Sequence, residues 1–239
     1  GSKDPVWIQA LKNDQDLHSV CAELVYGNEW GSSAEDNCNY IMNKSKCNCP
    51  KHIKLRTNVK TINFGLAYGM GPNKLADNLQ ISVPEAGSLI KKYFQAFPAI
   101  GGFLGKLGTF GKRHGYITTF PPFKRKRWFD KWYDKIWHHR SSIMELGSIE
   151  RASKNTPIQG ASADMTKLAL ILIYKYIKNN KIPVKLIMTV HDQIDTICQQ
   201  DYSEEWKLKM TELMEEAAVT IVKNGLLKAD TKISKTWEK

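Results

Sequence analysis

The chain has 239 residues, 42% of them hydrophobic, which is enough for one sizeable core or a two-lobed domain. Its net charge of +11 and isoelectric point near 9.3 favour a polyanionic partner, of which nucleic acid is the commonest. The sequence shows no signal-peptide pattern and no apolar run of about 18 residues, so we expect neither secretion nor membrane insertion. The five cysteines, an odd number, argue against a closed disulfide framework and favour a reducing compartment.

The first half of the chain is predicted to be mainly helical. Apolar residues recur with helical spacing in two segments between residues 4 and 27. Residues 29–53 are polar and rich in Gly, Ser and Asn, so we expect an irregular insertion there. A helix is predicted from about 55 to 69, ended by Gly71-Pro72, and another from 83 to 97.

Glycines at 102, 105, 108 and 111 recur every three residues. On a helix this spacing would make a smooth ridge that another backbone could approach closely, whereas the same glycines also suit a flexible loop. Both interpretations stay open at this point. Residues 121–140 are basic and aromatic-rich, and a long helix is predicted to start near Pro157.

Residues 184–200 are predicted to form a strand, a tight turn and a second strand, with His191 and Asp192 at the tip. An acid in that position can hold a divalent cation, or Asp192 can simply satisfy the amides of the turn. A helix is expected after this hairpin, followed by a short C-terminal strand.

The stretch "RTNVKTINFGLAYGMG", residues 56–71, carries two cations and two aromatics at four-residue intervals: Arg56, Lys60, Phe64 and Tyr68. On a helix these side chains form one slanted face. The cations near its N-terminal half suit phosphate, the aromatics suit a base, and Gly65 and Gly69 would leave clearance for a flat group. An ordinary amphipathic helix with snorkelling cations is the alternative.

A second cluster lies in the polar insertion, where four potential metal ligands fall within fifteen residues: Cys38, Cys47, Cys49 and His52. Structural Zn²⁺ is tetrahedral and favours such Cys₃His sets, so a zinc ion could order this segment. Free thiols in a polar loop are the alternative, and the Cys-x-Cys spacing is tighter than the usual two-residue gap.

Four motifs, in the right order over nearly the whole chain, resemble those of the A-family DNA polymerases, the bacterial DNA polymerase I family. The pattern Arg-x3-Lys-x3-Phe-Gly-x2-Tyr-Gly resembles the family's nucleotide-binding finger helix, and "VHDQI" resembles its catalytic palm hairpin. "DLHSVCAEL" is similar to the first finger helix, and "SIERASKNTPIQGASADM" is similar to the segment that contacts the primer–template.

The resemblance implies roles for particular residues. Arg56 and Lys60 would bind the triphosphate of the incoming dNTP with help from His18, while Phe64 and Tyr68 would lie near the nucleotide and the templating base. Arg151, Asn155 and Gln159 would reach the DNA primer–template near the primer end, with a kink expected at Pro157. His191 would lie by the primer terminus, and Asp192 would ligate catalytic Mg²⁺ in a two-metal site.

Three departures from the family pattern stand out. Gln193 replaces the carboxylate that usually follows the hairpin Asp. The family's other metal-binding Asp belongs on a strand upstream of the first finger helix, where this sequence starts with "GSKDPVW". We therefore expect either a fragment or one piece of a split polymerase, with a second polypeptide supplying the missing palm Asp, the thumb and an exonuclease region.

The third departure is the basic segment after Gly115-Tyr116, where the family has a short arginine-rich turn. This segment could grip the DNA backbone and stack on a displaced strand, form a solvated basic face, or dock a partner. The residues concerned are Lys124, Arg125, Lys126 and Arg127, together with Trp132 and Trp137.

The sequence thus predicts an α+β fold with three segments: helical fingers over 1–120 that include the insertion at 29–53, a basic aromatic insertion over 121–140, and a C-terminal palm over 141–239. The expected function is template-directed DNA synthesis in a bacterial or phage-infected cytoplasm. A non-catalytic module that binds primer–template or a polymerase partner is the alternative, and a single-subunit RNA polymerase is a more distant one. Phe64-Gly65 favours the DNA enzymes.

Overall fold

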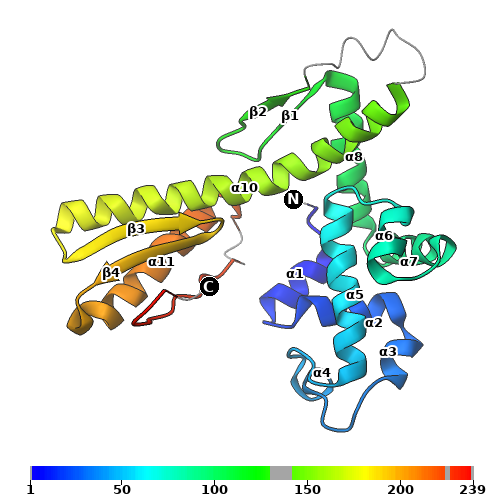
Figure 1. The fold of residues 1–239 in the computed structure, drawn as a ribbon, viewed down its shortest axis with the longest axis horizontal. Helices are drawn as coiled ribbons and strands as arrows, with labels where there is room; N and C mark the ends of the chain where they lie inside the picture. Colours follow the sequence, from blue (N-terminus) through cyan, green and yellow to red (C-terminus); the bar gives the residue numbers. More distant parts are fainter. Residues whose placement is uncertain (1, 130–141, 224–226, 238–239) are drawn as a thin grey trace. The chain divides into compact units, whose positions relative to one another are not determined.

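The structure is a computed structural model that describes residues 2–129, 142–223 and 227–237. It is mainly helical and has two two-stranded sheets, which confirms the predicted α+β class (Figure 1). The described chain divides into two compact units. The first unit comprises Gly1–Ile117 and Arg127–Thr156, and the second comprises Thr118–Lys126 and Pro157–Lys239.

The first unit opens with α1 (Pro5–Lys12) and α2 (Leu17–Tyr26), which confirms the two N-terminal helical segments. Each helix begins at an aspartate N-cap, because the Asp4 and Asp16 carboxylates accept hydrogen bonds from amides of the first turn. The prediction of an irregular insertion at 29–53 was wrong in part. Two short helices form there, α3 (Asn28–Ser32) and α4 (Asn39–Asn43).

The longest helix wholly within the first unit is α5 (Pro50–Ala67), which begins one turn earlier than the sequence predicted. Pro50 at the first helical position explains the early start, since its ring fixes a helical φ and it has no amide hydrogen to leave unsatisfied. The buried side of α5 carries Val59 and Ile62, and α2 packs against it. Burial of each such side chain contributes about 1.5–3 kcal/mol.

Three further helices complete this unit: α6 (Pro72–Leu79), α7 (Val83–Ala96) and α8 (Pro98–His114). In α7 the Ser82 hydroxyl and the Glu85 carboxylate form a reciprocal capping box. The glycine-rich stretch is therefore helical, which resolves the choice that the sequence left open. Only part of the glycine ridge meets another helix, as Gly108 and Gly111 lie against α10 and Gly102 and Gly105 have open space beside them.

The helix α10 (Ser142–Asn180) corrects a second expectation, because it begins well before Pro157 and runs through that residue. In the first unit it is tied to α8 by Glu150, whose carboxylate accepts hydrogen bonds from Lys112 and Lys154 at 2.6 Å and 2.7 Å. These two hydrogen bonds lower the pKa of Glu150 to about 2. Before α10, the strands β1 (Tyr116–Thr118) and β2 (Lys126–Trp128) pair within the segment that the sequence marked as basic.

The second unit is built on the antiparallel pair β3 (Val184–Val190) and β4 (Gln193–Cys198), as predicted. One face of this hairpin packs on α10 and on α11 (Ser203–Ile221), with Ile173, Ile194 and Trp206 in the shared core (Figure 1). The predicted C-terminal strand is not found among the described residues 227–237.

No helix in the described part of the chain is long and apolar enough to cross a membrane. The three predicted segments, 1–120, 121–140 and 141–239, stay a prediction. The two compact units are defined by contacts, and α10 belongs to both of them.

Candidate functional site

The first predicted site residue, Arg56 on α5, is held by Asp16. Its Nε and Nη2 atoms donate hydrogen bonds of 2.7 Å and 2.6 Å to the two carboxylate oxygens. Asp16 in turn accepts hydrogen bonds from the amide and the hydroxyl of Ser19, at 2.9 Å and 2.6 Å. Burial raises the pKa of Asp16, but Arg56 and Ser19 lower it by more, to about 2. Among the described residues, no hydrogen bond from the Nη1 group of Arg56 is formed.

Three more predicted residues gather on the same face. Lys60 is exposed and forms no ion pair with a described residue, and the ring centroids of Phe64 and His18 lie 5.9 Å apart. Asn63 Nδ2 lies 3.0 Å from His18 Nδ1, and because an amide nitrogen only donates, the imidazole proton is on Nε2. Burial lowers the pKa of His18 and the charges of Arg56 and Lys60 lower it further, so His18 is a neutral donor at pH 7.

The aromatics of this face are exposed, Phe64 to 49% and Tyr68 to 43%. A large apolar ring that remains half exposed beside a cation gains little from the fold itself. Such rings are common where a flat ligand stacks.

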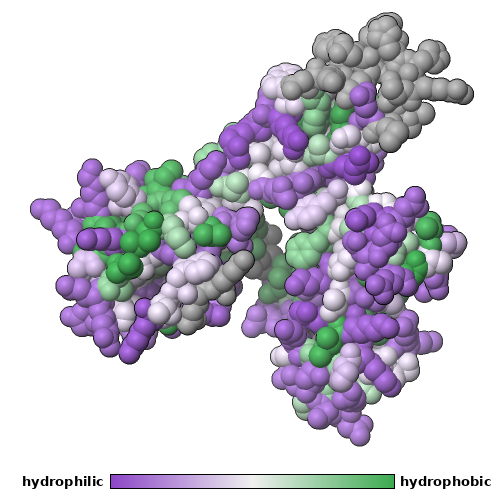
Figure 2. Space-filling model, in the orientation of Figure 1, coloured by the Kyte–Doolittle hydropathy of each residue, from purple (hydrophilic) through white to green (hydrophobic). Residues whose placement is uncertain are grey.

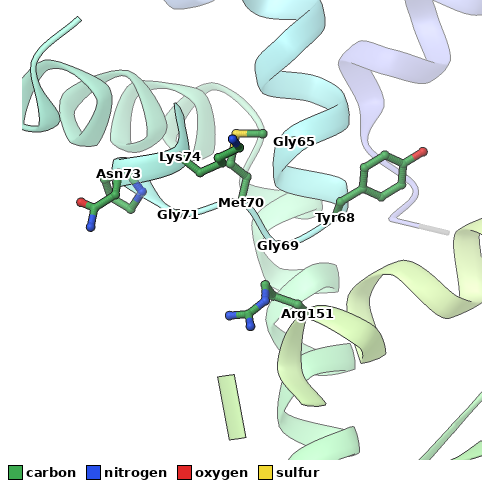
Figure 3. A pocket seen from close by; sticks show the side chains of 9 residues that line it. Gly65, Tyr68, Gly69, Met70, Gly71, Asn73, Lys74 and Arg151 are labelled. Carbon is green, nitrogen blue, oxygen red and sulfur yellow. The ribbon is translucent and has the colours of Figure 1, made fainter. Parts of the chain in front are cut away.

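The end of α5 is fixed by Gly69, which has φ +74°. The Met70 amide donates to the Gly65 carbonyl at 2.8 Å and the Gly69 amide donates to Leu66 at 3.0 Å, the pattern of a Schellman motif. This turn forms one wall of a pocket of 540 Å³. Figure 3 shows Tyr68 at the end of α5, Asn73 and Lys74 at the start of α6, and Arg151 projecting from α10 beneath the turn.

The expected clearance at the glycines was wrong for this structure. A Cβ atom at Gly65 would lie 2.7 Å from the Met70 side chain, and one at Gly69 would lie 2.7 Å from Arg151. Protein side chains therefore occupy the space that the sequence assigned to a base. The open volume lies beside the turn, between Tyr68, Lys74 and Arg151.

The residues predicted to meet DNA lie on α10 and on the segment before it. Arg151 and Gln159 are exposed, and the Asn155 side-chain oxygen is buried without a hydrogen-bond partner among the described residues. A buried oxygen of this kind calls for a partner from outside the chain or from water.

The basic segment is more strongly tied to the fold than the sequence suggested. Arg125 donates to the buried Asp164 carboxylate at 2.8 Å, and Arg127 donates to the Thr156 hydroxyl at 3.0 Å. Lys124 and Lys126 are exposed. Trp132 and Trp137 lie outside the described residues.

At the palm hairpin, His191 and Asp192 form the two-residue turn between β3 and β4, and both are exposed. His191 has φ +56°, a left-handed conformation that a residue with a side chain adopts at a cost. Gln193 donates to Asp195 at 2.7 Å, so the amide that replaces the expected carboxylate is bound on its own strand. The tip presents the single carboxylate of Asp192, a hard oxygen ligand of the type that Mg²⁺ prefers.

The potential soft-metal ligands also converge. The ligand atoms of Cys38, Cys49 and His52 all lie within 4.8 Å of one another, and all three residues are buried. Cys47 is buried beside Ser19, whose hydroxyl oxygen is 3.3 Å from its sulfur.

Sequence reasoning missed Asp16, Ser19, Asn63 and Lys74. The Asp16-x2-Ser19 spacing is a capping pattern at a helix start, so the local role of Asp16 could have been found. Its pairing with Arg56, 40 residues away, leaves no local signal.

Known proteins resemble this chain over most of its length. It is 32% identical to DNA polymerase I of Bacillus caldotenax over 236 residues, which are 99% of this chain and 24% of that protein. It is also 32% identical to DNA polymerase I of Caldicellulosiruptor bescii, over 85% of this chain and 21% of that protein. The chain thus spans about a quarter of the length of these relatives.

Similarity to solved structures also supports the fold. The POL domain of Pol1 from M. smegmatis, in complex with DNA primer-template and dNTP, aligns with a TM-score of 0.72 and 26% identity. The alignment covers 90% of this chain and 34% of that one. A family model described as DNA polymerase family A matches residues 1–239. From motifs, fold and this match along its whole length, the chain belongs to DNA polymerase family A.

Proposed function

We propose that this chain binds dNTP and primer–template DNA for template-directed DNA synthesis, as the fingers and the later palm of a family A polymerase. One observation carries the proposal: His18, Arg56, Lys60 and Phe64 meet on one face of α2 and α5, with Tyr68 at its end. A surface with cations at one end and exposed aromatic rings at the other fits a nucleoside triphosphate.

Each group has a distinct part in this proposal. Asp16 orients the Arg56 guanidinium and leaves Nη1 free to donate to a phosphate oxygen. Lys60 adds a full charge, and neutral His18 adds an Nε2–H donor. Phe64 packs against the sugar and base, and Tyr68 lies beside the templating base at the pocket that Lys74 and Arg151 line.

The hairpin supplies the chemistry at the primer end. Asp192 would hold Mg²⁺, and His191 would lie by the primer terminus. Mg²⁺, when bound, makes the primer 3′-hydroxyl a better nucleophile and stabilises the leaving pyrophosphate. Lys60 and Arg56 neutralise the charge that develops on the triphosphate, so they bind the transition state more tightly than the substrate.

The remaining polar residues of α10 and the basic segment would position the DNA. Arg151, Asn155 and Gln159 are proposed to contact the duplex near the primer end, and the exposed Lys124 and Lys126 to contact phosphates. Arg125 and Arg127 are the weaker candidates, because Asp164 and Thr156 already engage them.

Two-metal catalysis needs a second carboxylate beside Asp192. We propose that it comes from the upstream palm, together with the thumb, either on the same polypeptide or on a second one. In the second case the enzyme is a split polymerase, and the present chain is active only in the assembly.

Primer extension tests this proposal. The assay contains Mg²⁺, four dNTPs and a primed template, and it compares this chain alone with a mixture that includes a family A upstream palm and thumb. We expect extension only in the mixture, with a loss of at least ~100-fold in Asp192→Ala, because removal of a metal ligand costs several kcal/mol of barrier. Asp77→Ala, an exposed acid on α6, is the control and should keep full activity.

The other outcomes are equally informative. Extension by the chain alone would mean that the second carboxylate lies within these 239 residues. DNA binding without extension in any mixture would contradict the proposed enzyme activity and support a non-catalytic module that binds primer–template. Incorporation of ribonucleotides in preference to dNTPs would point to an RNA polymerase.

A further inference from the structure

The polar insertion closes around three buried metal-ligand side chains. Cys38 precedes α4, Cys49 is the N-cap of α5 and His52 lies in the first turn of α5. Their side chains are 0% exposed, and their ligand atoms fall within 4.8 Å of one another. Two buried sulfur atoms and a ring nitrogen this close together are a donor set of the kind that binds a soft metal ion.

His52 is oriented as a ligand. Its Nε2 lies 2.8 Å from the Trp30 carbonyl oxygen, which can only accept, so Nε2 carries the proton. The lone pair of Nδ1 is left facing Cys38, whose sulfur is 3.2 Å away. Stacking on the Trp30 ring, at 3.7 Å between centroids and 4° between planes, fixes the imidazole in this position. A second ring nitrogen bonded to a backbone carbonyl is typical of zinc-bound histidine.

Cys47 is the candidate for the fourth ligand. The residue is 4% exposed and its sulfur lies 3.3 Å from the Ser19 hydroxyl, but it is not within 4.8 Å of all three other ligand atoms. In tetrahedral coordination, Zn–S and Zn–N bonds of about 2.0–2.3 Å separate the ligand atoms by roughly 3.5–3.8 Å. The 3.2 Å contact between Cys38 and His52 needs only a small opening to reach that value, and Cys47 would have to move closer to complete the set.

We propose that Cys38, Cys47, Cys49 and His52 bind one structural zinc ion that fastens the insertion to the start of α5. A set of three thiolates and one imidazole selects Zn²⁺ over the hard cations Mg²⁺ and Ca²⁺, which prefer oxygen ligands. The site is closed, since all four side chains are protein ligands, so its role is structural.

The position of this site links it to the candidate nucleotide face. The Cys47 sulfur contacts Ser19, Ser19 donates to Asp16, and Asp16 holds Arg56. A zinc ion at Cys47 would therefore stabilise the group that orients Arg56. This inference does not depend on DNA synthesis, because metal binding and α5 stability can be measured without it.

The test is the zinc content of the purified full chain after dialysis against metal-free buffer, by atomic emission. We expect one zinc per chain in the wild type and a loss of ~100-fold or more in zinc affinity for Cys38→Ser and Cys49→Ser, more than removal of an outer hydrogen bond costs. Cys198→Ser, a cysteine of the second unit that is distant in sequence, is the matched control and should retain the full zinc content.

A second readout covers variants that fail to fold. Titration of the reduced, metal-free wild type with Co²⁺ should give the visible spectrum of a tetrahedral cobalt–thiolate complex, weaker in Cys47→Ser. Hydrogen exchange at the first turns of α5 should slow when Zn²⁺ is added. Wild-type protein that binds no zinc, an octahedral cobalt spectrum, or a Cys38–Cys49 disulfide in place of the metal would each overturn the proposal.

Discussion

The most informative residue for the candidate nucleotide face is Asp16, which the motif itself does not contain. A free Arg56 on a mobile side chain would have to be ordered when a nucleotide binds, at a cost of up to about 2 kcal/mol in rotamer entropy. The two hydrogen bonds from Arg56 to Asp16 restrict that side chain before any ligand arrives. The acid thus lowers the net charge of the site but improves its geometry.

Asp16→Asn should reduce the stability of the fold in a pH-dependent way. The folded-state pKa of Asp16, about 2, lies below its ordinary value of 3.8. The stabilisation, about 2 kcal/mol, is therefore fully present above pH 4 and is lost as the pH falls towards 2. Asparagine keeps one acceptor oxygen for the N-cap hydrogen bond, but it removes the charge and replaces the oxygen that accepts from Arg56 Nη2 with a donor group. Urea unfolding at pH 7 should show the loss, and between pH 4 and 2 the stability of the variant should fall less steeply than that of the wild type, since Glu150 still titrates in this range.

Asp14→Asn is the control, because Asp14 is exposed and has φ +51°, a conformation that asparagine adopts readily. Its free energy of unfolding should match that of the wild type within about 0.5 kcal/mol. Equal losses in the two variants would show that the Asp16–Arg56 pair adds nothing.

Lys60→Ala should lower the rate of nucleotide incorporation without changing stability. Lys60 is exposed and unpaired among the described residues, so the fold does not need it. We expect a fall of ~100-fold in kcat for single-nucleotide incorporation by the assembled polymerase, the cost of removing one group that stabilises transition-state charge. Lys54→Ala, on α5 about 120° around the helix axis, should leave the rate unchanged. A similar loss in both variants would mean that Lys60 acts only through its positive charge and not through a specific contact with the triphosphate.

At the scale of elements, the glycines of α8 fall into two groups that a sequence pattern cannot distinguish: those that contact another helix and those that face open space. Gly111 lies against Ser153, which is fully buried on α10, whereas a Cβ atom at Gly105 would meet nothing within 4 Å. Both residues carry the same propensity cost in a helix. Only Gly111 offsets it by allowing two helices to approach.

Gly111→Ala and Gly105→Ala should therefore have opposite effects. The first substitution overpacks the contact with Ser153 and should destabilise the fold by about 1–3 kcal/mol. The second removes a mid-helix glycine from an open surface and should stabilise it by about 0.5–1 kcal/mol. Urea denaturation of the two variants measures both values. Stabilisation by both substitutions would mean that α8 and α10 are not in close contact in solution.

For the molecule as a whole, the outer face of the β3–β4 hairpin is unusually apolar. Figure 2 shows hydrophobic residues gathered over this hairpin, and Ile187 and Ile197 are 53% and 61% exposed. The described part of the chain offers only two strands here, and an isolated pair with unpaired edges is prone to add further strands. This face fits the proposal that the upstream palm completes the sheet.

The double variant Ile187→Thr/Ile197→Thr should reduce self-association of the isolated chain. Threonine keeps the β-branch that strands favour and removes exposed apolar surface. Light scattering at increasing protein concentration measures the effect. Leu208→Thr, at the most exposed large apolar side chain of α11, is the control and should change little. If the control reduces association as much as the double variant, general hydrophobicity is responsible and not the hairpin.

The sequence by itself determined the elements that depend on local periodicity: the helical face of Arg56, Lys60, Phe64 and Tyr68, and the hairpin with His191 and Asp192 at its tip. The sequence-based prediction misplaced the start of α10, because it placed Pro157 at the beginning of the helix. In the structure Pro157 lies inside α10, which continues on both sides of it. Local rules of this kind act within a few residues, so they carry no information on packing between elements.

Only the tertiary structure decided how these elements serve the site. It paired Arg56 with Asp16, filled the space at Gly69 with Arg151, and brought Cys38 to His52 across fourteen positions of sequence. Each of these contacts joins residues that are distant in the sequence. They meet only when the helices and turns that carry them pack together. The physical reason is that burial and charge pairing are settled when elements meet in the core, after local propensity has chosen them.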